Sequence, residues 1–235
     1  EAVSWAKLNK QRIAGELTNK AIYPPDAKPV AFFMAGCPAA GKTEFAKAFA
    51  QAVGVAFNAN GDPIMHIDAD EIRELMPNYN GANSSLFQYP ASIIVDRAFD
   101  LIMRNRQSFI LDGTLSDERI AVRNVKRCLR KGYDVSVLYV YNNPVLAWEA
   151  ARLREVRDGR AIDLDVFIDR YFKSKATIRR LKKEFGKDVH VDLLFKELDA
   201  KSVRPRFNVG DIDNYLPEKY TPVSLRAELT KSERK

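Results

Sequence analysis

An apolar segment that leads into a glycine-rich loop and then into a helix-forming segment constrains the fold more than any other part of the chain. It reads VAFFMAGCPAAGKTEFAKAF over residues 30–49, and GCPAAGKT within it matches the spacing G-x-x-x-x-G-K-[ST]. In such a loop, backbone N–H groups point at phosphate oxygens, and the following helix N-terminus adds partial positive charge. A tight turn with an exposed lysine is the alternative, but the flanking strand and helix patterns favour phosphate binding. The sequence therefore predicts that the chain binds a nucleoside triphosphate.

The residues of this loop have separate expected roles. Lys42 is expected to reach the β- and γ-phosphates, and the hydroxyl of Thr43 is expected to bind Mg²⁺. ATP and Mg²⁺ are therefore the expected cofactors. The backbone that is expected to surround the phosphates belongs to Gly36, Cys37, Pro38, Ala39, Ala40 and Gly41.

Strand-like and helix-like segments alternate along the chain. Strands are expected near residues 30–35, 63–70, 108–114, 133–141 and 188–197, and helices near 4–20, 43–53, 69–76, 91–105, 117–132, 143–159 and 164–185. Almost wholly apolar strands are typical of a parallel sheet that helices cover on both faces. We therefore expect an α/β fold of the P-loop NTPase and kinase type. One domain over 1–235 is expected, with an N-terminal helical segment (1–28), a loop (78–90) and a C-terminal extension (199–235) that packs as a hairpin and loop or partly frays.

Composition narrows the class of protein. The net charge is +7 and the isoelectric point about 9.3. We interpret most of this excess as solvated helix faces, so a nucleic-acid partner is not expected, although an anionic partner is the alternative. No run of about 18 uncharged apolar residues occurs, so no membrane span is expected. Cys37 and Cys128 form neither a metal-binding pattern nor a disulfide framework, which suits a reducing cytosol and a cytoplasmic location.

Acidic residues follow two of the expected strands. Asp68 and Asp70 lie in HIDADEIR, and Asp112 lies in FILDGT. Ligands bind at the carboxyl ends of parallel strands, so these acids are expected near the phosphate loop. Asp70 is a candidate to accept the proton of an acceptor hydroxyl, and Asp112 is a candidate to orient Mg²⁺ or its water. Helix capping by the first pair and a turn role for Asp112 are the alternatives.

Arginines cluster in ARLREVRDGRA, where Arg152, Arg154, Arg157 and Arg160 occupy a helix and the loop after it. Phosphoryl transfer spreads negative charge over the moving group, and arginines on a mobile lid stabilise that charge. A basic helix face that pairs with neighbouring acids is the alternative. The chain has no guanine-reading N-K-x-D run, which counts against a switch GTPase.

With these motifs, the chain resembles the zeta toxin family, which are phosphate-loop kinases of bacterial toxin–antitoxin systems. The similarity runs from about residue 29 to 195 and is carried by MAGCPAAGKT, IDADEIRELMPNY, ILDGT and RLREVRDGRA. The resemblance implies transfer of the ATP γ-phosphate to the sugar 3′-hydroxyl of UDP-N-acetylglucosamine, which blocks cell-wall precursor synthesis. It also implies restraint by an antitoxin protein. The N-terminal helix is either part of a cis-acting inhibitory segment or simply packed on the domain.

Matching the family motifs position by position implies a role for each residue. Asp70 matches the catalytic base, Lys42 acts on the ATP phosphates, and Arg154 and Arg160 match the arginines that clamp the transferring phosphate. Metal binding is implied for Thr43 and Asp112. The implied substrate-binding residues are Asp68, Asp96, Asp112 and Thr114.

Two of these implications have alternatives. Helical periodicity alone predicts a solvated side chain for Asp96. Residues 79–91 depart from the family pattern where an acceptor is expected to bind. A kinase of the same fold that acts on an antibiotic, a dinucleotide or a nucleic-acid end is therefore the second hypothesis, and a non-enzymatic nucleotide-gated binder is the third.

Overall fold

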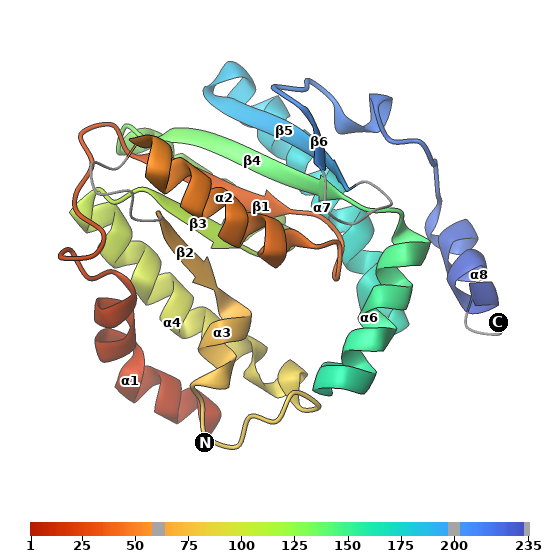
Figure 1. Ribbon diagram of the computed structural model, residues 1–235, viewed down its shortest axis with the longest axis horizontal. Coiled ribbons are helices and arrows are strands. Elements are labelled where there is room, and N and C mark those ends of the chain that lie inside the picture. The colour runs from red at the N-terminus through yellow and green to blue at the C-terminus, as the bar shows by residue number, and fades with distance from the viewer. Residues whose placement is uncertain (58–63, 197–202, 233–235) are drawn as a thin grey trace.

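The computed structural model describes residues 1–57, 64–196 and 203–232 (Figure 1). Within these ranges, six strands form one sheet in the order β2-β3-β1-β4-β5-β6. The first five strands pair in parallel, and β6 pairs antiparallel with β5 at the edge. The α/β prediction is therefore confirmed. The strands are β1 (Val30–Ala35), β2 (Met65–Asp68), β3 (Phe109–Asp112), β4 (Asp134–Tyr141), β5 (Val189–Lys196) and β6 (Val203–Arg206).

Helices cover both faces of the sheet (Figure 1). Alternate residues of a strand point to opposite faces, so β1 contributes to two buried clusters. Phe33 packs in one cluster with Ile94 and Val125, and Met34 packs in the other with Trp148. The helices are α1 (Ala2–Leu17), α2 (Lys42–Phe57), α3 (Ala69–Glu74), α4 (Ser84–Asn105), α5 (Glu118–Arg130), α6 (Pro144–Asp158), α7 (Leu164–Phe185) and α8 (Pro222–Ser232), with 3₁₀ turns at Gly186–Asp188 and Ile212–Asn214.

The start of α4 corrects the expectation of a loop over 78–90. The helix begins at Ser84 and contains Pro90 in its interior. Proline removes one helical hydrogen bond, and this is why the segment resembles a loop in sequence. Phe87, Pro90, Ala91 and Ile94 are all buried at helical spacing, so packing of this face outweighs the missing bond.

The two ends of the chain pack on the central layers. Helix α1 lies along α4 and buries Ala6, Ile13 and Ala14, so the expected N-terminal helix is confirmed. The C-terminal extension corrects the expectation of a hairpin and loop, because its last part forms α8, which packs on α6 and α7 through Leu225 and Leu229. Parts of two expected strands and of the C-terminal extension lie outside the described residues, namely 63, 197–202 and 233–235. Among the helices that the structure describes, none has the length and apolar character to span a membrane.

Candidate active site

The carboxyl ends of β1, β2 and β3 open into a cavity of about 350 Å³. Helices α4, α6 and α7 supply the other walls. The structure brings most of the predicted site residues together in this lining, namely Pro38, Ala39, Lys42, Thr43, Asp68, Asp70, Asp112, Thr114, Arg154 and Arg160. Gly36, Cys37, Ala40 and Gly41 complete the same loop but do not line the cavity.

The loop between β1 and α2 folds closely against the sheet. Gly36 has a φ of 133°, and a Cβ at this position would lie 2.4 Å from the carbonyl oxygen of Val140. Its N–H donates to Oγ of Ser174 at 3.0 Å, which ties the loop to α7. Lys42 is buried, and its Nζ donates to the carbonyl of Cys37 at 2.6 Å. Burial lowers the pKa of Lys42. The loop therefore holds a desolvated cation in the lining of the cavity, at the start of α2, which suits a phosphate ligand.

Asp68 and Asp70 occupy the junction of β2 and α3 in different ways. Asp68 caps α3, because its side chain accepts a hydrogen bond from the N–H of Asp70 at 2.8 Å. Burial and the nearby charge of Asp112 raise the pKa of Asp68 to about 6. The capping alternative therefore holds for Asp68, while the carboxylate of Asp70 is left to face the cavity.

Three arginines converge on the carboxylate of Asp70. Arg73 forms an ion pair with Oδ1 from the next turn of the same helix. From the other side of the cavity, Arg160 Nη1 lies 3.4 Å and Arg154 Nη2 lies 3.9 Å from Oδ2. The predicted base and the predicted clamp arginines are thus neighbours, although they come from opposite walls.

The predicted metal residues also lie together. Thr43 Oγ1 donates to Asp112 Oδ2 at 2.7 Å, and His66 Nε2 lies 3.3 Å from the same oxygen. Burial acts to raise the pKa of Asp112, but the hydrogen bonds from His66 and Thr43 and the charge of Lys42 hold it below its usual value. A hydroxyl beside an ionised carboxylate is a donor set that Mg²⁺ accepts, so these residues fit the expected ion.

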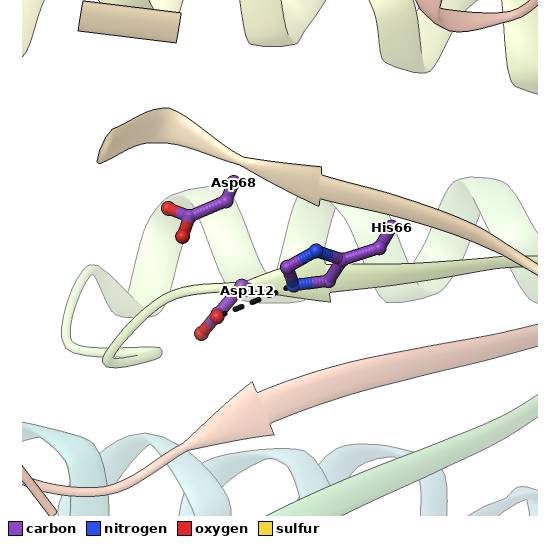
Figure 2. Close-up of side chains that lie close together, drawn as sticks. All are labelled: His66, Asp68 and Asp112. Atoms are coloured by element: carbon purple, nitrogen blue, oxygen red, sulfur yellow. Dashed lines mark hydrogen bonds and ion pairs between the residues drawn. The ribbon is translucent and has the colours of Figure 1, made fainter. Parts of the chain in front are cut away.

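Figure 2 shows His66, Asp68 and Asp112 close together at the ends of neighbouring strands. Each offers one potential ligand atom, and these atoms lie within 4.8 Å of one another. The two acids are among the residues predicted from the sequence, and the histidine is not. The signal was available, because His66 and Asp68 are two residues apart on a strand and so share a face.

Two further predicted residues differ in their placement. Thr114 lines the cavity, and its hydroxyl lies 2.8 Å from that of Ser116. Asp96 does not line the cavity, because it lies about two helical turns beyond Gln88, the last residue of α4 in the lining. Its exposed carboxylate pairs with Arg123 at 2.9 Å, in agreement with the solvated reading of its periodicity. A substrate role for Asp96 stays a prediction.

Several residues in the cavity lining were not predicted from the sequence. Arg73 had a signal, because residues three apart on a helix face one another and it follows Asp70 at that spacing. Arg170 projects from α7, is half-buried, and has a pKa lowered by burial. It lies far from any motif, so only the tertiary fold places it here. The other polar additions are Ser84, Ser85, Gln88, Ser116 and Asp163.

The turn before α4 touches the end of α6. A Cβ at Gly81 would lie 2.5 Å from the carbonyl oxygen of Asp158, so only glycine permits this approach. The carboxylate of Asp158 in turn lies 3.4 Å from Arg160. The segment that leads into the polar wall of α4 therefore packs directly against the segment that carries the arginines.

Comparisons with known proteins identify the family and the fold of the chain. A family model described as zeta toxin matches residues 13–203. No curated protein matches the chain. A structure from the PezAT chromosomal toxin–antitoxin system of the human pathogen Streptococcus pneumoniae is similar with a TM-score of 0.65 and 18% identity, covering 98% of this chain and 94% of that chain. A structure of AvrRxo1-ORF1:-ORF2 with ATP is similar with a TM-score of 0.62 and 14% identity, covering 84% of this chain and 64% of that chain. At these identities the structural likeness shows the fold.

Proposed function

The chain belongs to the zeta toxin family of phosphate-loop kinases, and we propose that it transfers the γ-phosphate of ATP to the sugar 3′-hydroxyl of UDP-N-acetylglucosamine. The observation that carries the proposal is the meeting of Asp70 with Arg154 and Arg160 in the cavity that also contains Lys42 and Thr43. A general base, a phosphate clamp and a phosphate-binding loop are the parts that phosphoryl transfer to a hydroxyl requires.

The donor half of the reaction belongs to the loop after β1. The loop N–H groups and the buried ammonium of Lys42 hold the β- and γ-phosphates. Thr43 and Asp112 would hold Mg²⁺, which neutralises charge on the phosphates when bound. The bond between Gly36 N–H and Ser174 keeps the loop in position beneath the phosphates.

Asp70 is assigned the proton transfer. Its carboxylate takes the proton of the acceptor hydroxyl, the hydroxyl oxygen bonds to the γ-phosphorus, and the bond from that phosphorus to the ADP oxygen breaks. The negative charge on the moving group requires cations, and Arg154 and Arg160 lie beside Asp70 on the α6 side of the cavity. A transferring phosphate between them would replace Asp70 as the partner of both arginines, which frees Oδ2 to act as a base while Arg73 stays paired with Oδ1.

The acceptor half combines hydroxyl and amide groups with cations. Ser84, Ser85 and Gln88 of α4 can hydrogen-bond a sugar, and Arg73 and Arg170 can pair with a diphosphate. This combination supports a sugar nucleotide, and the cavity has the size of a small-molecule site. The same wall falls in residues 79–91, which depart from the family pattern. That departure favours the second candidate, a kinase of the same mechanism with another small acceptor.

An antitoxin partner is part of the proposal. The similar pneumococcal structure comes from a toxin–antitoxin system, and a protein that covers the cavity would keep ATP out. We place the reaction in the cytoplasm, where ATP and nucleotide sugars occur. The tight packing of α1 on α4 supports a structural role for the N-terminal helix over a cis-acting inhibitory one.

The test is a transfer assay with ATP and Mg²⁺ against UDP-N-acetylglucosamine, other UDP-sugars, chloramphenicol, NAD and a 5′-hydroxyl oligonucleotide, read by mass spectrometry. Asp70→Asn should lower kcat by about 10²–10⁴-fold and leave ATP affinity within about threefold. Asp100→Asn is the matched control, because Asp100 is an exposed acid of α4 that pairs with Arg127 outside the cavity. Near-wild-type turnover in Asp70→Asn would contradict the base assignment. If only another acceptor gains phosphate, the assignment of UDP-N-acetylglucosamine is wrong and the proposed mechanism stands.

A further inference from the structure

Strand geometry places His66, Asp68 and Asp112 on one face of the sheet. His66 and Asp68 are two residues apart on β2, so their side chains point the same way. Asp68 lies opposite Asp112 in the parallel register of β2 and β3, so these two carboxylates are side by side. The arrangement is therefore a consequence of the sheet and does not depend on a loop.

The three side chains are shielded from solvent. The side chains of His66 and Asp112 are 11% and 4% exposed, and Asp68 is also buried. Their potential ligand atoms lie within 4.8 Å of one another, and Figure 2 shows the His66 ring pointing to Asp112 with Asp68 beside them. Two buried carboxylates at this spacing repel each other, and a cation between them removes that repulsion.

Ligand chemistry indicates which cation fits. Mg²⁺ is bound through oxygen and keeps most of its water, whereas imidazole nitrogen favours first-row transition metals. We propose that His66, Asp68 and Asp112 bind a divalent first-row transition-metal ion, for which Mn²⁺ is the probe, and that the imidazole of His66 makes this site prefer such an ion to Mg²⁺. Mn²⁺ suits the mixed set, because it accepts carboxylate oxygen as readily as Mg²⁺ and binds nitrogen more strongly.

The position of the site links it to phosphoryl transfer. Asp112 Oδ2 also accepts the hydroxyl hydrogen bond of Thr43, so the ion would take the position proposed above for Mg²⁺, next to the phosphate loop, and replace Mg²⁺ there. The role of the ion in catalysis rests on the proposed function, but its binding does not. The experiment therefore measures binding without ATP or acceptor, so a failure of kinase activity leaves its result unaffected.

The experiment is a titration of the full chain with Mn²⁺, followed by electron paramagnetic resonance of the free ion and by competition with Mg²⁺. His66→Gln keeps an amide that can bond Asp112 but removes the imidazole nitrogen. It should weaken Mn²⁺ binding about tenfold or more and change Mg²⁺ binding less than about threefold. The chain has two histidines, and the second, His190, is exposed on β5, so His190→Gln is the matched control and should leave both affinities unchanged.

A second measurement keeps the proposal testable if His66→Gln does not fold. Electron spin echo spectra of Mn²⁺ bound to His190→Gln should show coupling to nitrogen, and labelling histidine with ¹⁵N should change that coupling. Because His66 is then the sole histidine, the coupled nitrogen is assigned without a further variant. Bound Mn²⁺ without histidine coupling would overturn the proposal, as would Mn²⁺ affinity no greater than Mg²⁺ affinity.

Discussion

Arg160 Nη1 lies 3.4 Å from Oδ2 of Asp70, although 90 positions separate the two residues in the chain. Asp70 belongs to the start of α3, directly after β2, whereas Arg160 follows the end of α6. This contact joins the strand end that carries the proposed base to the segment that carries the proposed clamp. The distance between these two side chains is therefore a direct measure of whether the site is assembled.

The clamp arginines should act on the rate more than on stability. Arg154→Gln and Arg160→Gln should each lower kcat by about 10²–10³-fold, because each removes a cation beside the transferring charge. Both side chains are partly exposed, so the free energy of unfolding should change by less than about 1 kcal/mol. Steady-state kinetics and urea denaturation check both. Arg152→Gln is the control on the same helix, because Arg152 is exposed and pairs with Glu155. An equal rate loss in the control would contradict a specific clamp.

The contact of Gly81 with Asp158 should matter for both stability and rate. Gly81→Ala places a Cβ 2.5 Å from the Asp158 carbonyl oxygen, so the end of α6 must shift and take Arg160 with it. Gly132→Ala is the matched control, because Gly132 also has a positive φ, of 72°, and open space at the Cβ position. The control should lose about 1 kcal/mol of stability with unchanged kcat. Gly81→Ala should lose about 1–3 kcal/mol more and also lose kcat. Identical losses in the two variants would show that the close approach is unimportant.

The hydrogen bond from Gly36 to Ser174 should support the phosphate loop. Ser174 is fully buried, so Ser174→Ala leaves the Gly36 N–H with only its longer bond, to the Thr114 carbonyl at 3.5 Å, in place of the 3.0 Å bond. We expect a loss of about 1–3 kcal/mol in the free energy of unfolding and weaker ATP binding. Denaturation and calorimetry measure the two effects. Ser92→Ala removes an exposed hydroxyl that bonds the Tyr89 carbonyl and should change neither value. Unaltered ATP affinity in Ser174→Ala would show that this hydrogen bond is not needed for ATP binding by the loop.

Stability should depend on pH through Asp68. Its pKa is raised to about 6 in the folded chain by burial and by Asp112, whereas the unfolded side chain titrates near 3.8. The unfolded state therefore releases its proton first as the pH rises, so the stability contributed by the protonated form is complete below pH 3.8 and is lost as the pH rises through 6. The amide of Asp68→Asn does not titrate, so the variant does not lose this stability as the pH rises. In buffer with EDTA, the variant should gain on the order of 2 kcal/mol over wild type between pH 4 and 7. Parallel pH profiles from urea denaturation would contradict the assignment.

The loop, the strands and the acids of the site follow from contiguous patterns. GCPAAGKT carries its geometry within eight residues, and the acids sit where β2 and β3 end, so neither needs tertiary information. The predicted start of α4 was wrong, because Pro90 and a run of Asn and Ser are local loop signals. The packing of Phe87 overrides these signals. Arg170 could not be predicted, because its place in the cavity depends on how α7 crosses the sheet. The place of Asp96 could not be predicted for the same reason, because spacing along the chain does not determine which turn of a helix lines a cavity.

The two halves of the cavity differ in how they are anchored. The phosphate loop follows a central strand and is tied to α7, whereas the polar wall of α4 and the arginine segment meet through backbone contacts at Gly81 and Asp158. Under the proposed function, substitutions in Ser84, Ser85 or Gln88 would alter acceptor recognition without touching the residues assigned to the donor. If the assignment holds, acceptor choice and phosphate binding depend on separate parts of the cavity lining. A kinase built in this way can change its target by exchanging one turn of helix while its phosphate chemistry stays intact.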